Sequence, residues 1–176
     1  MADGLHLNLT FLDNDPLNMV VTCGGQPIYE VVTPSKFIHD CTTTITYIDK
    51  SFHRPVASID WNSTWSTIVH ISGLKIPLER FLLRTAMFSN SRTFYSFKGH
   101  RYKWEKSQSL MLYDSRRTVV ARLHRATPHQ KAFLEIMRSE LEEVLDEVLV
   151  SCVIMAKDAR LIRPVDNWHL HRRSCG

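Results

Sequence analysis

The stretch Val148-Leu-Val-Ser-Cys-Val-Ile-Met-Ala156 decides the fold of this 176-residue chain. Apart from Ser151, a helix over these residues would be apolar on every side. Such a helix in a globular protein has to be buried on every side. A flat sheet cannot enclose a helix, whereas a sheet that wraps round can. The stretch therefore predicts a helix inside a curled sheet.

The residues before and after this run favour a helix over a strand. Leu141, Val144 and Leu145 precede the run at helical spacing, and Ser139-Glu-Leu-Glu142 has the pattern of a capping box. Acidic residues gather near the start and basic ones near the end, which complements the helix dipole. We predict a helix that Ser139 caps and that ends near Arg160. The alternative is a central strand, which the β-branched residues of the run permit.

The chain ahead of this helix is typical of short strands separated by turns. Residues 5–11 alternate apolar and polar side chains, and Gly24-Gly25 is typical of a hairpin turn. About 10–12 such strands at regular spacing indicate an antiparallel barrel, closed or nearly closed. Residues 78–83 fit either a strand or one helical turn. The expected strands cover residues 5–11, 19–23, 27–32, 42–48, 57–61, 64–72, 74–77, 93–97, 101–106, 110–113, 118–123 and 132–137.

Charge is distributed unevenly along the chain. Residues 1–50 carry a net charge of −4, residues 51–126 carry +9, and residues 127–176 carry −1, which gives +4 for the whole. A local positive excess attracts phosphate groups and anionic membrane surfaces. The alternative interpretation is a set of solvated strand faces. Nucleic acid is not expected as a partner, because the overall charge is small and no nucleic-acid-binding motif occurs.

The candidate anion-binding residues lie within residues 84–125 of the basic segment. Around Gly99, basic residues are interleaved with Phe97, Tyr102 and Trp104. The sequence pattern predicts a hairpin tip at Arg116-Arg117. In a strand, alternate residues share one face, so these aromatic rings could also be core with the charges in solvent. The candidates are Arg84, Lys98, Arg101, Lys103, Arg116, Arg117 and Arg122.

Cysteines and histidines give no metal site. Cys23, Cys41, Cys152 and Cys175 form no C-x-x-C pair, so a structural zinc is not expected. Cys152 fits a small buried side chain, and a Cys23–Cys41 disulfide requires neighbouring strands. His169 and His171 are too few ligands for a metal. We expect no metal and no cofactor.

The chain has none of the common catalytic or targeting motifs. Neither a nucleophile elbow, a zinc-protease helix, a P-loop nor a dinucleotide-binding glycine pattern occurs. The N-terminus has neither the basic start nor the apolar stretch of a secretory signal, and no run approaches the length of a membrane span. We therefore expect a cytoplasmic protein, peripheral to membranes at most. Whether the protein is an enzyme stays open. A small cofactor-free enzyme with a pocket at the barrel mouth is one alternative, and a protein-interaction or structural module is another.

Several stretches resemble the signatures of a large domain-of-unknown-function family of mushroom-forming fungi. The stretches are Pro27–Phe37 with Thr42–Ile45, Gly99–Trp104, Val119–Ala121 and Leu145–Arg160. The resemblance runs from about Leu7 to Arg160, nearly the whole chain.

That fungal family is similar to tubby C-terminal, phospholipid-scramblase and plant LURP-like domains. The resemblance therefore implies an antiparallel β-barrel threaded by a hydrophobic C-terminal helix. Tubby domains bind phosphoinositides, scramblase relatives have lipid-linked roles, and the plant relatives act in defence. No functional residue carries over. We expect a single domain over residues 1–163, a tail over residues 164–176, and a non-enzymatic binding module attracted to anionic lipid surfaces.

Overall fold

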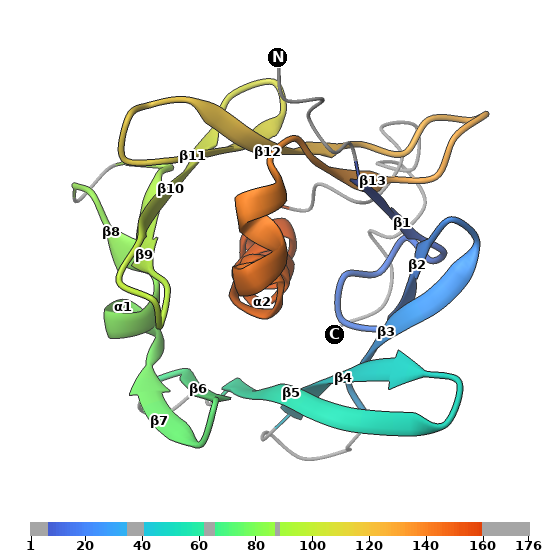
Figure 1. The fold of residues 1–176 in the computed structure, drawn as a ribbon. Helices are drawn as coiled ribbons and strands as arrows, with labels where there is room; N and C mark the ends of the chain where they lie inside the picture. Colours follow the sequence, from blue (N-terminus) through green and yellow to red (C-terminus); the bar gives the residue numbers. More distant parts are fainter. Residues whose placement is uncertain (1–6, 35–40, 62–65, 87–88, 160–176) are drawn as a thin grey trace, which may run out of the picture.

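The structure, a computed structural model, describes residues 7–34, 41–61, 66–86 and 89–159. These residues form one 13-stranded antiparallel sheet and a C-terminal helix, and the sheet curls round the helix (Figure 1). The helical segments are α1 (Leu78–Phe81), a 3-10 segment η1 (Ser139–Val144) and α2 (Leu145–Ala159). The strands are β1 (Leu7–Phe11), β2 (Met19–Cys23), β3 (Gln26–Val32), β4 (Cys41–Asp49), β5 (Phe52–Trp61), β6 (Ile68–Ile71), β7 (Leu74–Pro77), β8 (Leu83–Arg84), β9 (Arg92–Tyr95), β10 (Arg101–Lys106), β11 (Leu110–Tyr113), β12 (Val119–His124) and β13 (Phe133–Ile136).

The sheet is a meander with one long-range pairing. The strand order is β7-β6-β5-β4-β3-β2-β1-β13-β12-β11-β10-β9-β8, so β1 and β13 join the two halves. The expected mainly-β fold with one long helix is confirmed. The expected closure and the count of about 10–12 strands are not: there are 13 strands, and β7 and β8 are the edges of an open sheet.

Local chemistry explains why the sheet stays open. The first edge strand ends at Pro77, which has no N–H to donate to a neighbour. The chain then turns through α1, and the other edge strand is only two residues long. The sequence pattern of residues 78–83 fits either a strand or one helical turn, and in the structure these residues are mainly the single turn of α1.

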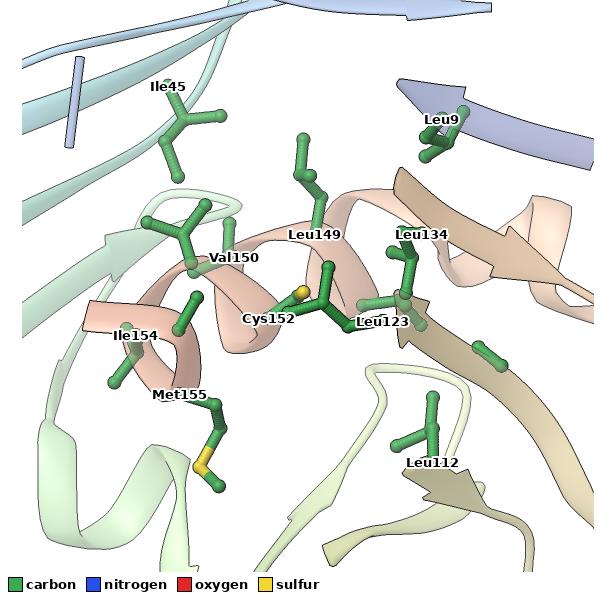
Figure 2. Close-up of a cluster of buried hydrophobic side chains, with 14 of the residues drawn as sticks. Leu9, Ile45, Leu112, Leu123, Leu134, Leu149, Val150, Cys152, Ile154 and Met155 are labelled. Carbon is green, nitrogen blue, oxygen red and sulfur yellow. The ribbon is translucent and has the colours of Figure 1, made fainter. Parts of the chain in front are cut away.

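The interior of the curled sheet is filled by α2. Each residue from Val148 to Ala156 is at most 4% exposed. Figure 2 shows Leu149, Val150 and Cys152 of the helix among side chains from strands on several sides. This confirms the buried helix and shows that the central-strand alternative is wrong. Burial of one such aliphatic side chain contributes about 1.5–3 kcal/mol, so this packing dominates the stability.

The only polar residue of the run has a specific partner. Trp104 of β10 is fully buried, and its indole N–H donates to Ser151 Oγ at 2.9 Å. The Ser151 hydroxyl donates in turn to the Val148 carbonyl at 3.0 Å. Because a buried polar group without a partner is costly, this pair fixes how α2 is rotated against the sheet.

The predicted capping box is wrong. The N-cap of η1 is Arg138, in an extended conformation, and no side chain caps this end. Ser139 lies inside the first turn, and Leu141 N–H bonds the Arg138 carbonyl at 3.2 Å. Leu141 and Val144 are both buried and three residues apart, which is the period of a 3-10 helix. The α-helix itself therefore starts at Leu145 instead of Ser139.

The disulfide considered from the sequence does not form. Cys23 and Cys41 are free, because β3 lies between the strands that carry them. Cys152 is free and buried, and burial raises the pKa of its thiol to about 12. Cys175, His169, His171 and the expected domain boundary at residue 163 lie outside the described residues. Among the described helices, none has both the length and the hydropathy that a membrane crossing requires.

Candidate functional site

One end of the curled sheet collects most of the described hairpin turns. Because all strand pairs are antiparallel, the turns that follow β2, β4, β6, β9 and β11 lie at the same end. The chain also enters η1 and α2 from this end. We call it the mouth; it comprises residues 23–26, 49–54, 71–75, 95–101, 113–119 and 137–147.

A cleft of about 660 Å³ opens at the mouth, and we call it the basic cleft. Three arginines from separate elements line it: Arg101 at the start of β10, Arg116 in the β11–β12 turn, and Arg138 just before η1. The other lining residues are His100, Tyr102, Asp114, Ser115, Thr118, Val120, Ser139, Glu140, Leu141 and Glu143.

Asp114 shapes the turn that carries Arg116. Its Oδ1 accepts the backbone N–H groups of Arg116 at 2.9 Å and Thr118 at 2.8 Å. Arg117 adopts a φ of +62°, which bends the chain at the tip. An Asp that bonds backbone groups further along is common turn chemistry. The position of Arg116 at the cleft thus follows from its neighbours in sequence.

The β9–β10 turn is attached to the beginning of α2. Gly99 has a φ of +82°, and its N–H donates to the Ser96 carbonyl at 2.8 Å. The Phe97 N–H donates to the buried Glu147 carboxylate at 3.3 Å. Lys98 forms an ion pair with Glu143 of η1. The central helix therefore holds this side of the basic cleft in place.

The basic cleft contains both acidic and basic groups, but they differ in whether they are already bonded within the protein. Asp114 bonds its own turn, and Lys98 holds the pKa of Glu143 below its ordinary value. Within the described ranges, the guanidinium groups of Arg101, Arg116 and Arg138 have no ion pair or hydrogen bond. Such groups are suited to bidentate binding of phosphate or carboxylate oxygens.

A second cleft of about 570 Å³ lies at the mouth and shares Glu143 with the basic cleft. Here Asp146 accepts hydrogen bonds from the Tyr29 hydroxyl at 2.8 Å and from Arg54 at 2.7 Å. Arg54 also lies over the Tyr47 ring, 5.6 Å from its centre. Burial and the Asp146 carboxylate raise the pKa of Tyr29 well above its ordinary value. These groups satisfy one another, so we interpret the cluster as a clamp on the start of α2.

The structure brings together only part of the predicted set. Arg101 and Arg116 line the basic cleft, Lys98 lies beside it through Glu143, and Arg117 shares the hairpin tip with Arg116. The other three candidates lie on strands and do not line the cleft. Lys103 pairs with Glu105 at 2.6 Å, and Arg122 lies 4.0 Å from the Met111 sulfur. Arg84 of β8 lies opposite Arg92 of β9.

Sequence reasoning missed Arg138 as a lining residue, and it left His100, which belongs to the basic turn around Gly99, out of the candidate set. Arg138 is a single basic residue between β13 and η1, and only its position before a helix that starts at the mouth could have indicated its role. Two histidine–carboxylate pairs were missed as well: His124 with Glu135 at 2.8 Å and His70 with Asp60 at 3.0 Å. Both pairs lie on strands, outside the two clefts.

The fold and the clefts define a mainly-β domain built round a buried helix, with a basic cleft at one end. Residues 14–161 match a family of unknown function, DUF6593, and the chain belongs to this family. A search of the curated proteins finds no match. Among solved structures, the chain is similar to an X-ray structure of a protein from Arabidopsis thaliana, with 14% identity and a TM-score of 0.48. That alignment covers 89% of this chain and 91% of the other.

Proposed function

We propose that the protein is a non-enzymatic binding module that attaches to anionic lipid surfaces and holds a phosphate-bearing headgroup, such as a phosphoinositide, in the basic cleft. One observation carries the proposal: Arg101, Arg116 and Arg138 meet at one cleft from three elements with no internal ion pair among the described residues. Guanidinium groups bind phosphate oxygens in pairs and stay charged at every physiological pH.

The position of the basic cleft supports a surface-bound ligand. The cleft lies at the mouth, among exposed turns, so a headgroup that projects from a membrane could reach it. The resemblance to tubby-like domains, whose members bind phosphoinositides, favours the same ligand class. The net charge of +9 over residues 51–126 would add attraction at longer range.

The enzymatic alternative has less support from the described residues. The two histidine–carboxylate pairs lie on strands outside both clefts. In the second cleft, Tyr29, Arg54 and Asp146 bond one another. Neither arrangement leaves a paired acid and base aimed at an open space, as general acid–base catalysis requires.

Vesicle sedimentation with two charge-matched variants tests the proposal. The cleft variant is Arg101→Gln/Arg116→Gln/Arg138→Gln, and the control variant is Arg84→Gln/Lys106→Gln/Arg125→Gln. All three control residues are exposed and none lines the basic cleft. Each basic residue near an anionic surface contributes about 1 kcal/mol. The cleft variant, which lacks three, should therefore lose roughly 100-fold in affinity for phosphatidylcholine vesicles with 5% phosphatidylinositol bisphosphate.

The control variant should bind these vesicles within about threefold of the natural sequence. Equal losses in the two variants would show that net charge alone attracts the protein and would contradict a specific cleft. Absence of binding by the natural sequence would contradict the proposal altogether. Calorimetry with soluble inositol trisphosphate is the second test. Heat of binding with the natural sequence and its absence with the cleft variant would support a headgroup site.

A further inference from the structure

Three of the mouth turns each present an exposed apolar side chain. Phe52 is 53% exposed, Leu74 is 51% exposed and Phe97 is 46% exposed. Phe52 and Leu74 are the first residues after the β4–β5 and β6–β7 turns, and Phe97 lies in the β9–β10 turn. We call these three side chains the apolar tips. Large apolar groups that point into water at one end of a molecule indicate a surface that is covered in use.

Each apolar tip has a lysine close to it in sequence: Lys50 before Phe52, Lys75 after Leu74 and Lys98 after Phe97. The turns next to the tips, 49–54, 72–75 and 96–101, carry five Lys or Arg residues against one Asp. The mouth also contains five carboxylates on residues 137–147, of which Glu143 pairs with Lys98, Asp146 pairs with Arg54, and Glu147 accepts the Phe97 N–H. An anionic bilayer offers both an apolar layer for the tips and negative headgroups for the lysines beside them. A protein interface would instead favour one continuous apolar patch. The hairpins of Phe52 and Leu74 are neighbours in the sheet, but Phe97 belongs to the β9–β10 hairpin near the other edge.

We propose that Phe52, Leu74 and Phe97 insert into the interfacial layer of an anionic bilayer, so that the mouth is the membrane-facing end of the molecule. This inference rests on the proposed function and deepens it, since insertion would bring the basic cleft to the headgroup level. The occupant is an anionic lipid surface. The inference stands on the exposure of the tips and on the charge around them.

The tips are held in place before any membrane is bound. The Phe97 N–H is bonded to Glu147, and the neighbouring Lys98 is paired with Glu143, so the central helix fixes this tip. The Leu74 turn is tight, with φ of +51° at Ser72 and +75° at Gly73. Groups that are already ordered lose less conformational entropy on binding.

The opposite end of the sheet provides a contrast and a control. Leu12, in the β1–β2 turn, is 42% exposed, but Asp13 and Asp15 follow it. Carboxylates beside an apolar residue repel an anionic surface, so we expect Leu12 to stay out of the bilayer. Val32, at the end of β3, and Leu83, on β8, are also exposed and lie outside the mouth.

The first test compares two triple variants that change no charge. The tip variant is Phe52→Ser/Leu74→Ser/Phe97→Ser, and the control is Leu12→Ser/Val32→Ser/Leu83→Ser. In sedimentation with phosphatidylinositol bisphosphate vesicles, the affinity of the tip variant should fall by about tenfold or more. The affinity of the control should stay within about twofold of that of the natural sequence. The tip variant should still bind soluble inositol trisphosphate as the natural sequence does.

Those two readouts separate the inference from the proposed function. Vesicle binding by the tip variant at natural strength would overturn the insertion of the tips and leave the headgroup site intact. If the natural sequence binds neither the vesicles nor inositol trisphosphate, both the proposed function and this inference are overturned.

The second test measures depth directly. Phe97→Trp and Leu12→Trp each add one indole at an exposed position, and the natural sequence gives the background emission. With vesicles that contain brominated lipids, the added emission of Phe97→Trp should shift to the blue and be quenched, while that of Leu12→Trp should not change. Equal behaviour of the two variants on bound vesicles would overturn the proposal.

Discussion

The interior around α2 and the mouth are a few residues apart along the same strands, yet their chemistry is opposite. In the interior, Val148–Ala156 contacts apolar side chains, and Ser151 with Trp104 supplies a single polar link. At the mouth, charged groups such as Lys98 with Glu143 and Arg54 with Asp146 form partly exposed pairs.

This difference separates stability from binding. Burial of apolar surface contributes most of the folding free energy, whereas exposed ion pairs contribute little. Substitutions in the interior should therefore unfold the protein. Substitutions at the mouth can change binding with little effect on the fold, and this is why the vesicle variants proposed above are informative.

The largest effect is expected from Val153→Asp. Val153 is 1% exposed, and an unpaired carboxylate there would cost several kcal/mol, enough to unfold the protein. Circular dichroism should show loss of cooperative thermal unfolding. The matched control is Val32→Asp on β3, where the side chain is 37% exposed and the protein should stay folded. A folded Val153→Asp protein would contradict the buried helix.

A smaller loss is expected from Ser151→Ala. The substitution leaves the buried Trp104 N–H without an acceptor, which costs about 1–3 kcal/mol in the free energy of unfolding. Urea denaturation measures this change. In a double-mutant cycle with Trp104→Phe, the two effects should not add, because both variants remove one shared bond. Strict additivity would show that this bond does not link the helix to β10.

Removing a bond of the clamp at the mouth should lower the free energy of unfolding by less than the Ser151 substitution does. Tyr29→Phe removes the hydroxyl that bonds Asp146, and we expect a loss of about 1–2 kcal/mol, measured by urea denaturation. Tyr95→Phe is the control, because Tyr95 is 56% exposed and its substitution should leave stability unchanged. If the two variants behave alike, the Tyr29–Asp146 bond does not stabilise the start of α2.

The smallest effect is expected from Lys98→Gln. Lys98 lowers the pKa of Glu143, so their ion pair stabilises the fold above the ordinary carboxyl pKa and is lost as the pH falls through the folded value. In the variant, the pKa of Glu143 should return towards its ordinary value, which a carboxyl-carbon NMR titration measures. Because the pair is exposed, stability at neutral pH should hardly change. An unchanged pKa would contradict the ion pair.

The interior could be predicted from the sequence because its signal is local. The continuous apolar run from Val148 to Ala156 requires enclosure, and the alternating strands supply the wall. The partner of Ser151 could not be predicted, since Trp104 lies 47 residues away and only the folded register brings them together. The start of α2 was misplaced because Ser139 and Glu142 fit a capping box, while the buried Leu141 and Val144 impose a 3-10 turn.

The mouth was harder to predict because its residues come from separate turns. Arg101 and Arg116 were chosen as basic residues near turn signals, and both line the basic cleft. Lys103 shares a strand face with Arg101 but lies further along β10, and Arg122 lies within β12, so neither lines the basic cleft. Arg138 gave no local signal. Which charges converge depends on strand pairing, and composition does not reveal that pairing.

Native-state amide hydrogen exchange at residues 148–156 tests the central claim most directly. If the curled sheet encloses α2, these amides should exchange only through global unfolding, and their protection should equal the free energy of unfolding measured in urea. The mouth turns should exchange much faster under the same conditions. Exchange of residues 148–156 at rates typical of a solvent-exposed helix would contradict the enclosed helix.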